Sequence, residues 1–337
     1  MAHDTDDRDD IRTTEGDAGG SGRSGGWTAG LGAAAALAGL AWSVRQRARR
    51  ANHDHPPGGH WLYVEGVRLH YLDRGEGPPV VLIHGNGSLV QDFEISILPS
   101  LVERHRVVAF DRPGFGHSSR PRDRMWTPLA QADLLAAALW RMGLQRPLVV
   151  GHSAGVTVAL ALALAHPELV GGMVLMGGYA YPTVRPDFWP LSLPGTPVLG
   201  DLLRHTVSPA LSRLLLPKIC ERLFDPAPVP DGFIDGMPWE LILRPSQLRA
   251  ASQDLGFLNA ATAEMSPAYR RIDVPVIVLQ GDGDAVVPID DHGVRLAEAL
   301  PRGELRRLPG LGHMLHHSNP EAALGAIADI SARMGAR

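Results

Sequence analysis

The sequence predicts an α/β protein built on a mainly parallel sheet with helices on its faces. Short apolar runs recur along the chain, as expected of strands buried on both sides: PPVVLIHG, HRVVAFD, PLVVG, GGMVLMG and PVIVLQGD. Helical stretches alternate with these runs, notably residues 127–143 and 154–166, and the second stops before Pro167. This alternation is typical of a three-layer α/β fold, in which ligands bind beyond the carboxyl ends of the strands.

The composition excludes several classes of protein. Of 337 residues, 45% are hydrophobic and 20% charged, so a sizeable core can form and a fibrous or wholly disordered chain is excluded. The net charge of -4 argues against a nucleic-acid partner, which would require a strongly basic surface. The single cysteine, Cys220, excludes an intramolecular disulfide and a cysteine-rich metal site. His53 and His55 lack further ligands, so we expect no bound metal.

The first 60 residues differ from the rest of the chain. Residues 1–25 are acidic and then rich in Gly and Ser, which predicts a disordered tail because little apolar surface is available to bury. Residues 26–44 carry no charge and have Trp27 and Trp42 near their ends, which predicts a transmembrane helix. The basic linker 45–60 would then place the catalytic domain of a membrane-anchored protein on the cytoplasmic side. The alternatives are a surface helix or a flexible segment of a cytoplasmic protein.

The regular pattern begins near residue 61. There, WLYVEG and VRLHYLDRG predict two edge strands joined by a turn at Glu65–Gly66. The strand and helix alternation covers 61–178 and 269–337, which we assign to one α/β core. Between 179 and 268 the alternation stops and prolines become frequent. This insertion is rich in Leu and Pro and indicates an apolar pocket, with four aromatic residues: Phe188, Trp189, Phe224 and Trp239.

A serine stands at a sharp strand-to-helix turn, Gly151-His152-Ser153-Ala154-Gly155. A strand ends directly before this motif and a helix begins directly after it, so the hydroxyl of Ser153 is expected to project at the top of the sheet. The same spelling occurs at residues 22–26, where no strand precedes it, and we dismiss that match. We therefore expect Ser153 to be a nucleophile, which requires a base and an acid that orients the base.

The acid and the base are expected in loops after later strands. PVIVLQ leads to GDGD, which offers Asp282 and Asp284, and ELRRLPG leads to GLGH, which ends at His313. His316 and His317 are rival bases, but they lie deeper toward the final helix. The transition state also requires hydrogen-bond donors, which the HGNG loop at 84–87 and the backbone N–H of Ala154 can supply.

Five motifs follow one another in order at strand ends: HGNG at 84–87, DRPGFGHS at 111–118, GHSAG at 151–155, GDGD at 281–284 and GLGH at 310–313. With these motifs the chain resembles the α/β-hydrolase superfamily from residue 61 to 337, with a helical cap at 179–268. The resemblance implies that Ser153 is the nucleophile, Asp284 the acid and His313 the general base. It also implies an oxyanion hole at Asn86 and Ala154, and structural roles for Asp111 and Arg112.

The same motifs narrow the expected reaction. HGN resembles haloalkane dehalogenases and DRPGFG also resembles epoxide hydrolases, but both families use an aspartate where this chain has Ser153. A serine attacking an alkyl carbon would leave a stable ether, so both reactions are disfavoured. We expect a cofactor-independent carboxylic-ester hydrolase that acts on small to medium apolar molecules through an acyl-enzyme on Ser153. The alternatives are a carbon–carbon bond hydrolase or lipase with the same triad, and a non-catalytic binding protein on this fold.

Overall fold

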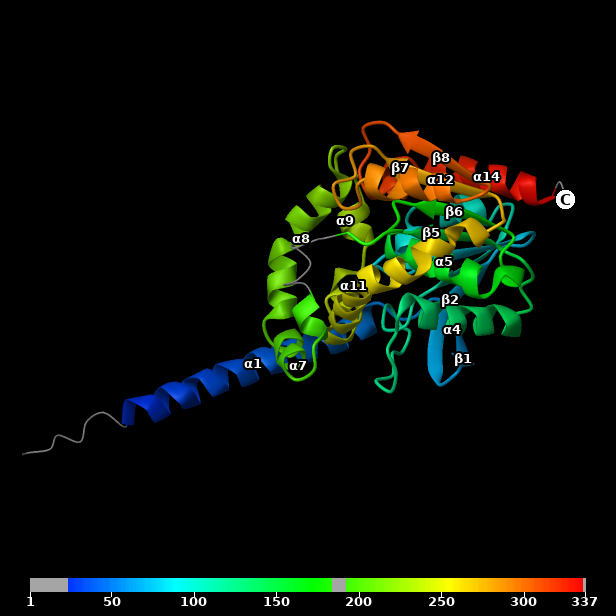
Figure 1. Ribbon diagram of the computed structural model, residues 1–337. Coiled ribbons are helices and arrows are strands. Elements are labelled where there is room, and N and C mark those ends of the chain that lie inside the picture. Colours follow the sequence, from blue (N-terminus) through cyan, green and yellow to red (C-terminus); the bar gives the residue numbers. More distant parts are fainter. Residues whose placement is uncertain (1–23, 184–191, 336–337) are drawn as a thin grey trace, which may run out of the picture.

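The computed structural model describes residues 24–183 and 192–335, and over these ranges the predicted α/β fold is confirmed (Figure 1). Eight strands form one sheet in the order β1-β2-β4-β3-β5-β6-β7-β8. The pairs β1–β2 and β2–β4 are antiparallel and all other neighbours are parallel. The strands are β1 (His60–Val64), β2 (Val67–Arg74), β3 (Pro79–Ile83), β4 (Arg106–Phe110), β5 (Leu148–His152), β6 (Gly172–Met176), β7 (Val276–Gly281) and β8 (Gly303–Leu308).

Three of the sequence predictions fall on residues outside these ranges. They are the disordered tail over 1–25, apart from its last two residues, and the aromatic residues Phe188 and Trp189. The predicted edge strands are present as β1 and β2, and the backbone of Glu65 and Gly66 has positive φ at the turn between them.

Helices cover both faces of the sheet because alternate residues of the central strands feed two separate cores. Val81 and Ile83 of β3 contribute to one core, while Val80 and Leu82 contribute to the other. The helices on the first face are α4 (Pro128–Arg141), α5 (Ala154–Ala165) and α12 (Arg295–Ala299). Those on the second face are α2 (Gln91–Glu94), α3 (Leu98–Leu101) and α14 (Pro320–Gly335).

The regular elements between β6 and β7 are all helical in the described part of the chain. α11 packs against α4 and α5 of the core and also against α7 and α8. These elements are η2 (Leu193–Gly195), α7 (Leu199–His205), α8 (Ser208–Phe224), α9 (Phe233–Gly236), α10 (Trp239–Ile242), α11 (Pro245–Met265) and η3 (Ser266–Arg271). The remaining short helices are η1 (Pro167–Leu169), η4 (Asp290–Val294) and α13 (Leu315–Ser318).

The membrane span predicted over residues 26–44 is not supported. The segment does form a helix, α1 (Ser24–Asp54), which extends away from the domain in Figure 1. Across the described residues, however, no helix combines the length and the apolar character needed to cross a bilayer. The physical reason is composition, since the run consists largely of Ala and Gly, which contribute little transfer free energy. Toward its C-terminal end α1 instead packs on the protein, where Val44 and Ala51 are buried.

The turn between β5 and α5 holds Ser153 in a strained backbone conformation. Its φ is 54° and its ψ is -121°, a region that residues with a side chain rarely adopt. The turn is closed by a near approach of α5 to β3, because a Cβ atom on Gly155 would overlap the carbonyl oxygen of Ile83. The absence of a side chain at Gly155 therefore allows the sheet and the helix to present Ser153 at the top of β5.

We predict that Gly155→Ala lowers the free energy of unfolding by about 3 kcal/mol, because the added methyl group has no space against β3. Gly325→Ala is the matched control, since Gly325 also lies within a helix but has no atom near its missing Cβ. That change should stabilise the protein by about 0.5–1 kcal/mol through helix propensity. Chemical denaturation measures both values, and equal stability of the two variants would contradict the steric argument.

Candidate active site

The residues assigned to a triad lie at the carboxyl ends of three parallel strands. Ser153 follows β5, Asp284 comes after β7 and His313 comes after β8. The Nε2 atom of His313 is 2.9 Å from Ser153 Oγ, and its Nδ1 atom is 2.8 Å from Asp284 Oδ2. All three side chains are buried. The structure thus brings together a hydroxyl, an imidazole and a carboxylate in the arrangement that activates a serine.

The backbone fixes the orientation of the carboxylate. Asp284 Oδ1 accepts hydrogen bonds from the N–H groups of Val286 and Val287, at 2.9 and 2.8 Å, so that Oδ2 is left for His313. The imidazole then donates from Nδ1 and offers Nε2 to the hydroxyl of Ser153. The rival acid Asp282 accepts from the N–H of Gly310 instead and does not reach the histidine ring.

The HGNG loop lies directly against the serine. The missing Cβ of Gly85 would be 3.1 Å from Ser153 Cβ, which shows how closely the loop approaches the nucleophile. Asn86 and Ala154, the two predicted oxyanion residues, line the same cavity as Ser153. Ala154 is also the first residue of α5, so the positive end of the helix dipole faces this cavity.

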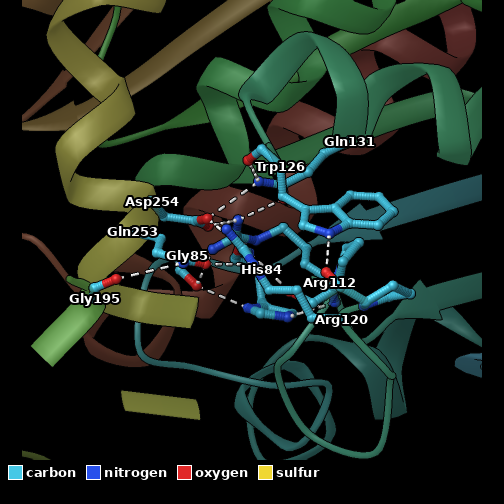
Figure 2. A network of polar contacts seen from close by, with 11 residues as sticks. His84, Gly85, Arg112, Arg120, Trp126, Gln131, Gly195, Gln253 and Asp254 are labelled. Atoms are coloured by element: carbon cyan, nitrogen blue, oxygen red, sulfur yellow. Dashed lines mark hydrogen bonds and ion pairs between the residues drawn. The ribbon is translucent and has the colours of Figure 1, made fainter. Parts of the chain in front are cut away.

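A buried arginine supports this loop from behind (Figure 2). Arg112 donates from Nε to the carbonyl oxygen of His84, at 2.9 Å, and from Nη2 to that of Gly85, at 3.0 Å. Its Nη1 atom donates to Gln131 of α4 and to Asp254 of α11. The guanidinium therefore holds two consecutive carbonyl groups of the loop and sets the direction in which the loop presents its N–H groups.

His84 takes part in the same support. Its Nε2 atom accepts from the N–H of Arg112 at 3.0 Å, and its Nδ1 atom donates to the carbonyl oxygen of Gly85. Burial, together with the nearby Arg112, lowers the pKa of His84 to about 4. The ring is thus neutral at physiological pH, which allows one nitrogen to accept while the other donates.

The neighbouring Asp111 has the structural role that the resemblance implies. It is fully buried and accepts hydrogen bonds from His70 Nδ1 and from the N–H groups of Val90 and His117. Burial alone would raise the pKa of Asp111, but the hydrogen bond from His70 holds it below its ordinary value. The ionised carboxylate therefore joins β2, the loop before α2 and the DRPGFG loop.

One acidic residue connects the helical insertion to the core. Asp254 of α11 lies 2.5 Å from Arg112 Nη1 and 2.9 Å from Arg120 Nη1, and all three side chains are at most 4% exposed. Sequence reasoning missed both Asp254 and Arg120, because neither belongs to a recognisable motif. Their partners are distant in sequence, and only the packing of α11 on the core brings them together.

A cavity of about 260 Å³ opens beside Ser153 and His313. Its wall is mainly apolar, and the segment between β6 and β7 contributes Ile219, Leu223, Phe233, Met237, Trp239, Leu255 and Leu258. Of the four predicted pocket aromatics, Trp239 lines the cavity, whereas Phe224 packs on Phe233 in the core of the insertion. No arginine or lysine occurs among the described lining residues.

Two titratable residues that the sequence analysis did not single out also line this cavity. Asp92 is fully buried, and although burial raises its pKa, His316 and His317 hold the pKa well below its usual value. His152 lies beside the triad, with its Nε2 atom 3.1 Å from the carbonyl oxygen of His313. Burial and the neighbouring His316 keep the pKa of His152 well below its ordinary value, so its imidazole is neutral. Asp92 is therefore ionised, and it lies against the imidazoles of His316 and His317.

Comparison with known families identifies the class of the protein. The family model of the alpha/beta hydrolase fold matches residues 78–320, and the chain belongs to this family. Solved structures of the same fold include an alpha/beta hydrolase fold protein from Burkholderia ambifaria, with 26% identity and a TM-score of 0.67. That alignment covers 80% of this chain and 97% of the other. A Thermogutta terrifontis esterase, with 22% identity and a TM-score of 0.68, covers 82% of this chain and 98% of its own, and supports the fold alone.

Curated relatives are hydrolases. A 2-hydroxy-6-oxononadienedioate/2-hydroxy-6-oxononatrienedioate hydrolase of Pseudomonas putida is 28% identical over 76% of this chain and 88% of its own. A 2-hydroxymuconate semialdehyde hydrolase of Pseudomonas sp. (strain CF600) is 27% identical over 85% of this chain and 98% of its own. Among solved structures, the meta-cleavage product hydrolase CumD of Pseudomonas fluorescens IP01 has 25% identity and a TM-score of 0.66, covering 82% of this chain and 98% of its own. The chain is thus an α/β hydrolase, and hydrolase activity is supported.

We predict that Asp254→Ala lowers the free energy of unfolding by about 3–5 kcal/mol, because it leaves two buried guanidinium groups without a counter-charge. Asp329→Ala is the control, since Asp329 pairs with Arg306 at an exposed position and should cost about 0–1 kcal/mol. Urea denaturation followed by circular dichroism compares them. A small and equal effect of the two substitutions would show that the buried cluster does not connect the insertion to the core.

Proposed function

We propose that the protein hydrolyses a bond at a carbonyl carbon, with Ser153 as the nucleophile, His313 as the general base and Asp284 as its orienting partner. The observation that carries this proposal is the hydrogen-bonded chain from Ser153 Oγ through His313 to Asp284. The cavity beside Ser153 gives an apolar substrate access to the hydroxyl. A small-molecule substrate fits both the size of this cavity and the names of the relatives.

The reaction follows from the geometry in two steps. His313 Nε2 accepts the Ser153 proton as Oγ bonds to the carbonyl carbon, and the N–H groups of Asn86 and Ala154 stabilise the resulting oxyanion. When the oxyanion collapses, the bond to the leaving group breaks and His313 returns the proton to that group. Water then gives a proton to His313 and attacks the acyl-enzyme, which releases an acid and restores Ser153. Asp284 retains its charge throughout and stabilises the imidazolium.

The first candidate reaction is hydrolysis of a carbon–carbon bond next to a ketone, which the sequence analysis held as an alternative. The curated relatives support it, since the names of several describe hydrolases of conjugated 6-oxo acids. A serine triad suits this reaction because the ketone carbon accepts Oγ and the departing carbon accepts the proton. The ester hydrolysis expected from the motifs becomes the second candidate.

One feature of the cavity favours the second candidate. The relatives' named substrates are carboxylates, whereas the described lining of this cavity has no arginine or lysine and includes the buried carboxylate of Asp92. A carboxylate buried without a cation is costly, so an uncharged molecule fits this cavity better than an anion. Ester substrates without a charge meet this requirement. A non-catalytic binding protein is disfavoured, because binding alone requires no hydrogen-bonded triad.

We predict that Ser153→Ala lowers kcat/KM for the protein's substrate by about 10³-fold or more, because no other group replaces the nucleophile. The assay uses two substrates with the same acyl group, one a conjugated ketone cleaved between carbons and the other an ester. Faster turnover of the ketone supports the first candidate, and turnover of the ester alone supports the second. The control is Ser331→Ala, a serine of α14 that should leave activity unchanged. Full activity in Ser153→Ala, or no turnover of either class, would overturn the proposal.

The absence of arginine and lysine from the described lining leads to a separate prediction about specificity. A conjugated ketone without a carboxylate should have a kcat/KM about 10-fold higher or more than its carboxylate analogue, equivalent to about 1.4 kcal/mol. Leu255→Arg places a cation in the cavity wall and should reduce or reverse this preference. Steady-state kinetics on both substrates test the prediction, and a preference of the wild-type protein for the carboxylate would contradict it.

A further inference from the structure

A second group of side chains lies beside the cavity, outside the triad. Asp92 of α2 meets His316 and His317 of α13, and one ligand-type atom from each residue lies within 4.8 Å of the other two. Asp92 Oδ1 is 2.6 Å from His317 Nε2 and 3.3 Å from His316 Nε2. The side chains of Asp92 and His316 are fully buried, and that of His317 is 4% exposed. His316 and His317 are the two histidines that the sequence offers as alternative general bases, and neither belongs to the triad.

The cluster contains polar atoms that the protein itself does not satisfy. Both ring nitrogens of His316 and the Oδ2 atom of Asp92 are buried without a hydrogen-bond partner. A buried polar group without a partner costs about 1–3 kcal/mol, so three such atoms on two neighbouring residues require an explanation. The 3.3 Å approach of His316 Nε2 to Asp92 lacks the geometry of a hydrogen bond. A ligand between His316 Nε2 and the carboxylate of Asp92 would satisfy the atoms that face each other, whereas His316 Nδ1 lies on the other side of the ring.

The donor set matches a metal ion better than an organic ligand. Two imidazoles and one carboxylate are nitrogen and oxygen ligands that Zn²⁺ accepts, with bonds of about 2.0–2.2 Å. Two ligands at such distances in a tetrahedral site are about 3.4 Å apart, close to the separation of His316 Nε2 from Asp92. His317 Nε2 lies only 2.6 Å from the same carboxylate, as a hydrogen-bond donor. To bind the metal, His317 would move its proton from Nε2 to Nδ1 and its ring would withdraw to about 3.4 Å from the oxygen. Three protein ligands leave the fourth position for water or another molecule.

We propose that Asp92, His316 and His317 form a binding site for one divalent transition-metal ion, with Zn²⁺ as the preferred occupant, at the edge of the substrate cavity. Asp92 also lines the cavity that contains Ser153, so the ion has a path from solvent through that cavity. His152 separates this site from the triad, with its ring centroid 4.4 Å from that of His316 and 4.9 Å from that of His313. The site does not depend on the proposed hydrolysis. A bound Zn²⁺ would add a cation beside the cavity, so the preference for uncharged substrates predicted above applies to the metal-free protein.

The test measures metal binding directly on the full chain. The protein is treated with a chelator, dialysed, and titrated with ZnCl₂ by isothermal calorimetry, with MgCl₂ as the comparison. We expect one Zn²⁺ per chain with no comparable Mg²⁺ binding, and a higher Tm in the presence of Zn²⁺. Co²⁺ added to wild-type protein should give the visible bands of a nitrogen- and oxygen-ligated ion, which needs no variant to fold. Absence of both Zn²⁺ binding and Co²⁺ bands would overturn the proposal.

Variants locate the site. His316→Gln and His317→Gln should each weaken Zn²⁺ binding about 100-fold or more, because each removes one of three ligands. The matched control is His166→Gln, since His166 Nε2 lies 2.8 Å from Asp133 at a more exposed position and belongs to no such cluster among the described residues. That variant should bind Zn²⁺ like the wild-type protein. Unchanged affinity in both His316→Gln and His317→Gln would contradict the assignment.

Discussion

The arrangement of the site depends on the buried guanidinium of Arg112. This group joins three parts of the chain: the HGNG loop through two carbonyl oxygens, α4 through Gln131, and α11 through Asp254. Buried ion pairs contribute little net stability when compared with apolar packing, but they fix geometry, because each partner tolerates few alternative positions. In this protein the fixed geometry is that of the loop beside Ser153. The same interaction therefore positions both the HGNG loop and α11, which contributes Leu255 and Leu258 to the cavity wall.

The sheet and α5 position the nucleophile, whereas the helices between β6 and β7 determine which substrates can reach it. Ser153 has its strained conformation because α5 and β3 approach closely at Gly155, so the position of the hydroxyl is determined by the backbone. The walls contributed by these helices are apolar. The buried polar residues that line the cavity include Ser153, His313, His152, Asp92 and Ser88. An uncharged carbonyl compound is consistent with this environment, both as a ketone and as an ester.

The α/β fold and the positions of the triad residues could be predicted from the sequence, because short local motifs indicate them. Ser153, Asp284 and His313 each follow a recognisable apolar strand, and the carboxyl ends of neighbouring parallel strands meet at one edge of a sheet. Asp254 could not be predicted, because it lies 142 residues from Arg112 and belongs to a helix whose packing no motif reports. The cluster of Asp92, His316 and His317 could not be predicted for the same reason, since α2 and α13 are short and distant in sequence. The lack of charge over 26–44 predicts a membrane span, but Ala and Gly do not supply sufficient hydrophobicity.

The proposed reaction requires that His313 activate Ser153 as a nucleophile, and covalent labelling of the serine measures this activation. A fluorophosphonate reacts with an activated serine hydroxyl, forming a phosphorus–oxygen bond as fluoride leaves, and mass spectrometry of the digested protein locates the adduct. We expect one phosphonyl group per chain, attached to Ser153, and a labelling rate at least ~10³-fold lower in His313→Gln. Labelling of a different residue, or an unchanged rate in His313→Gln, would contradict it.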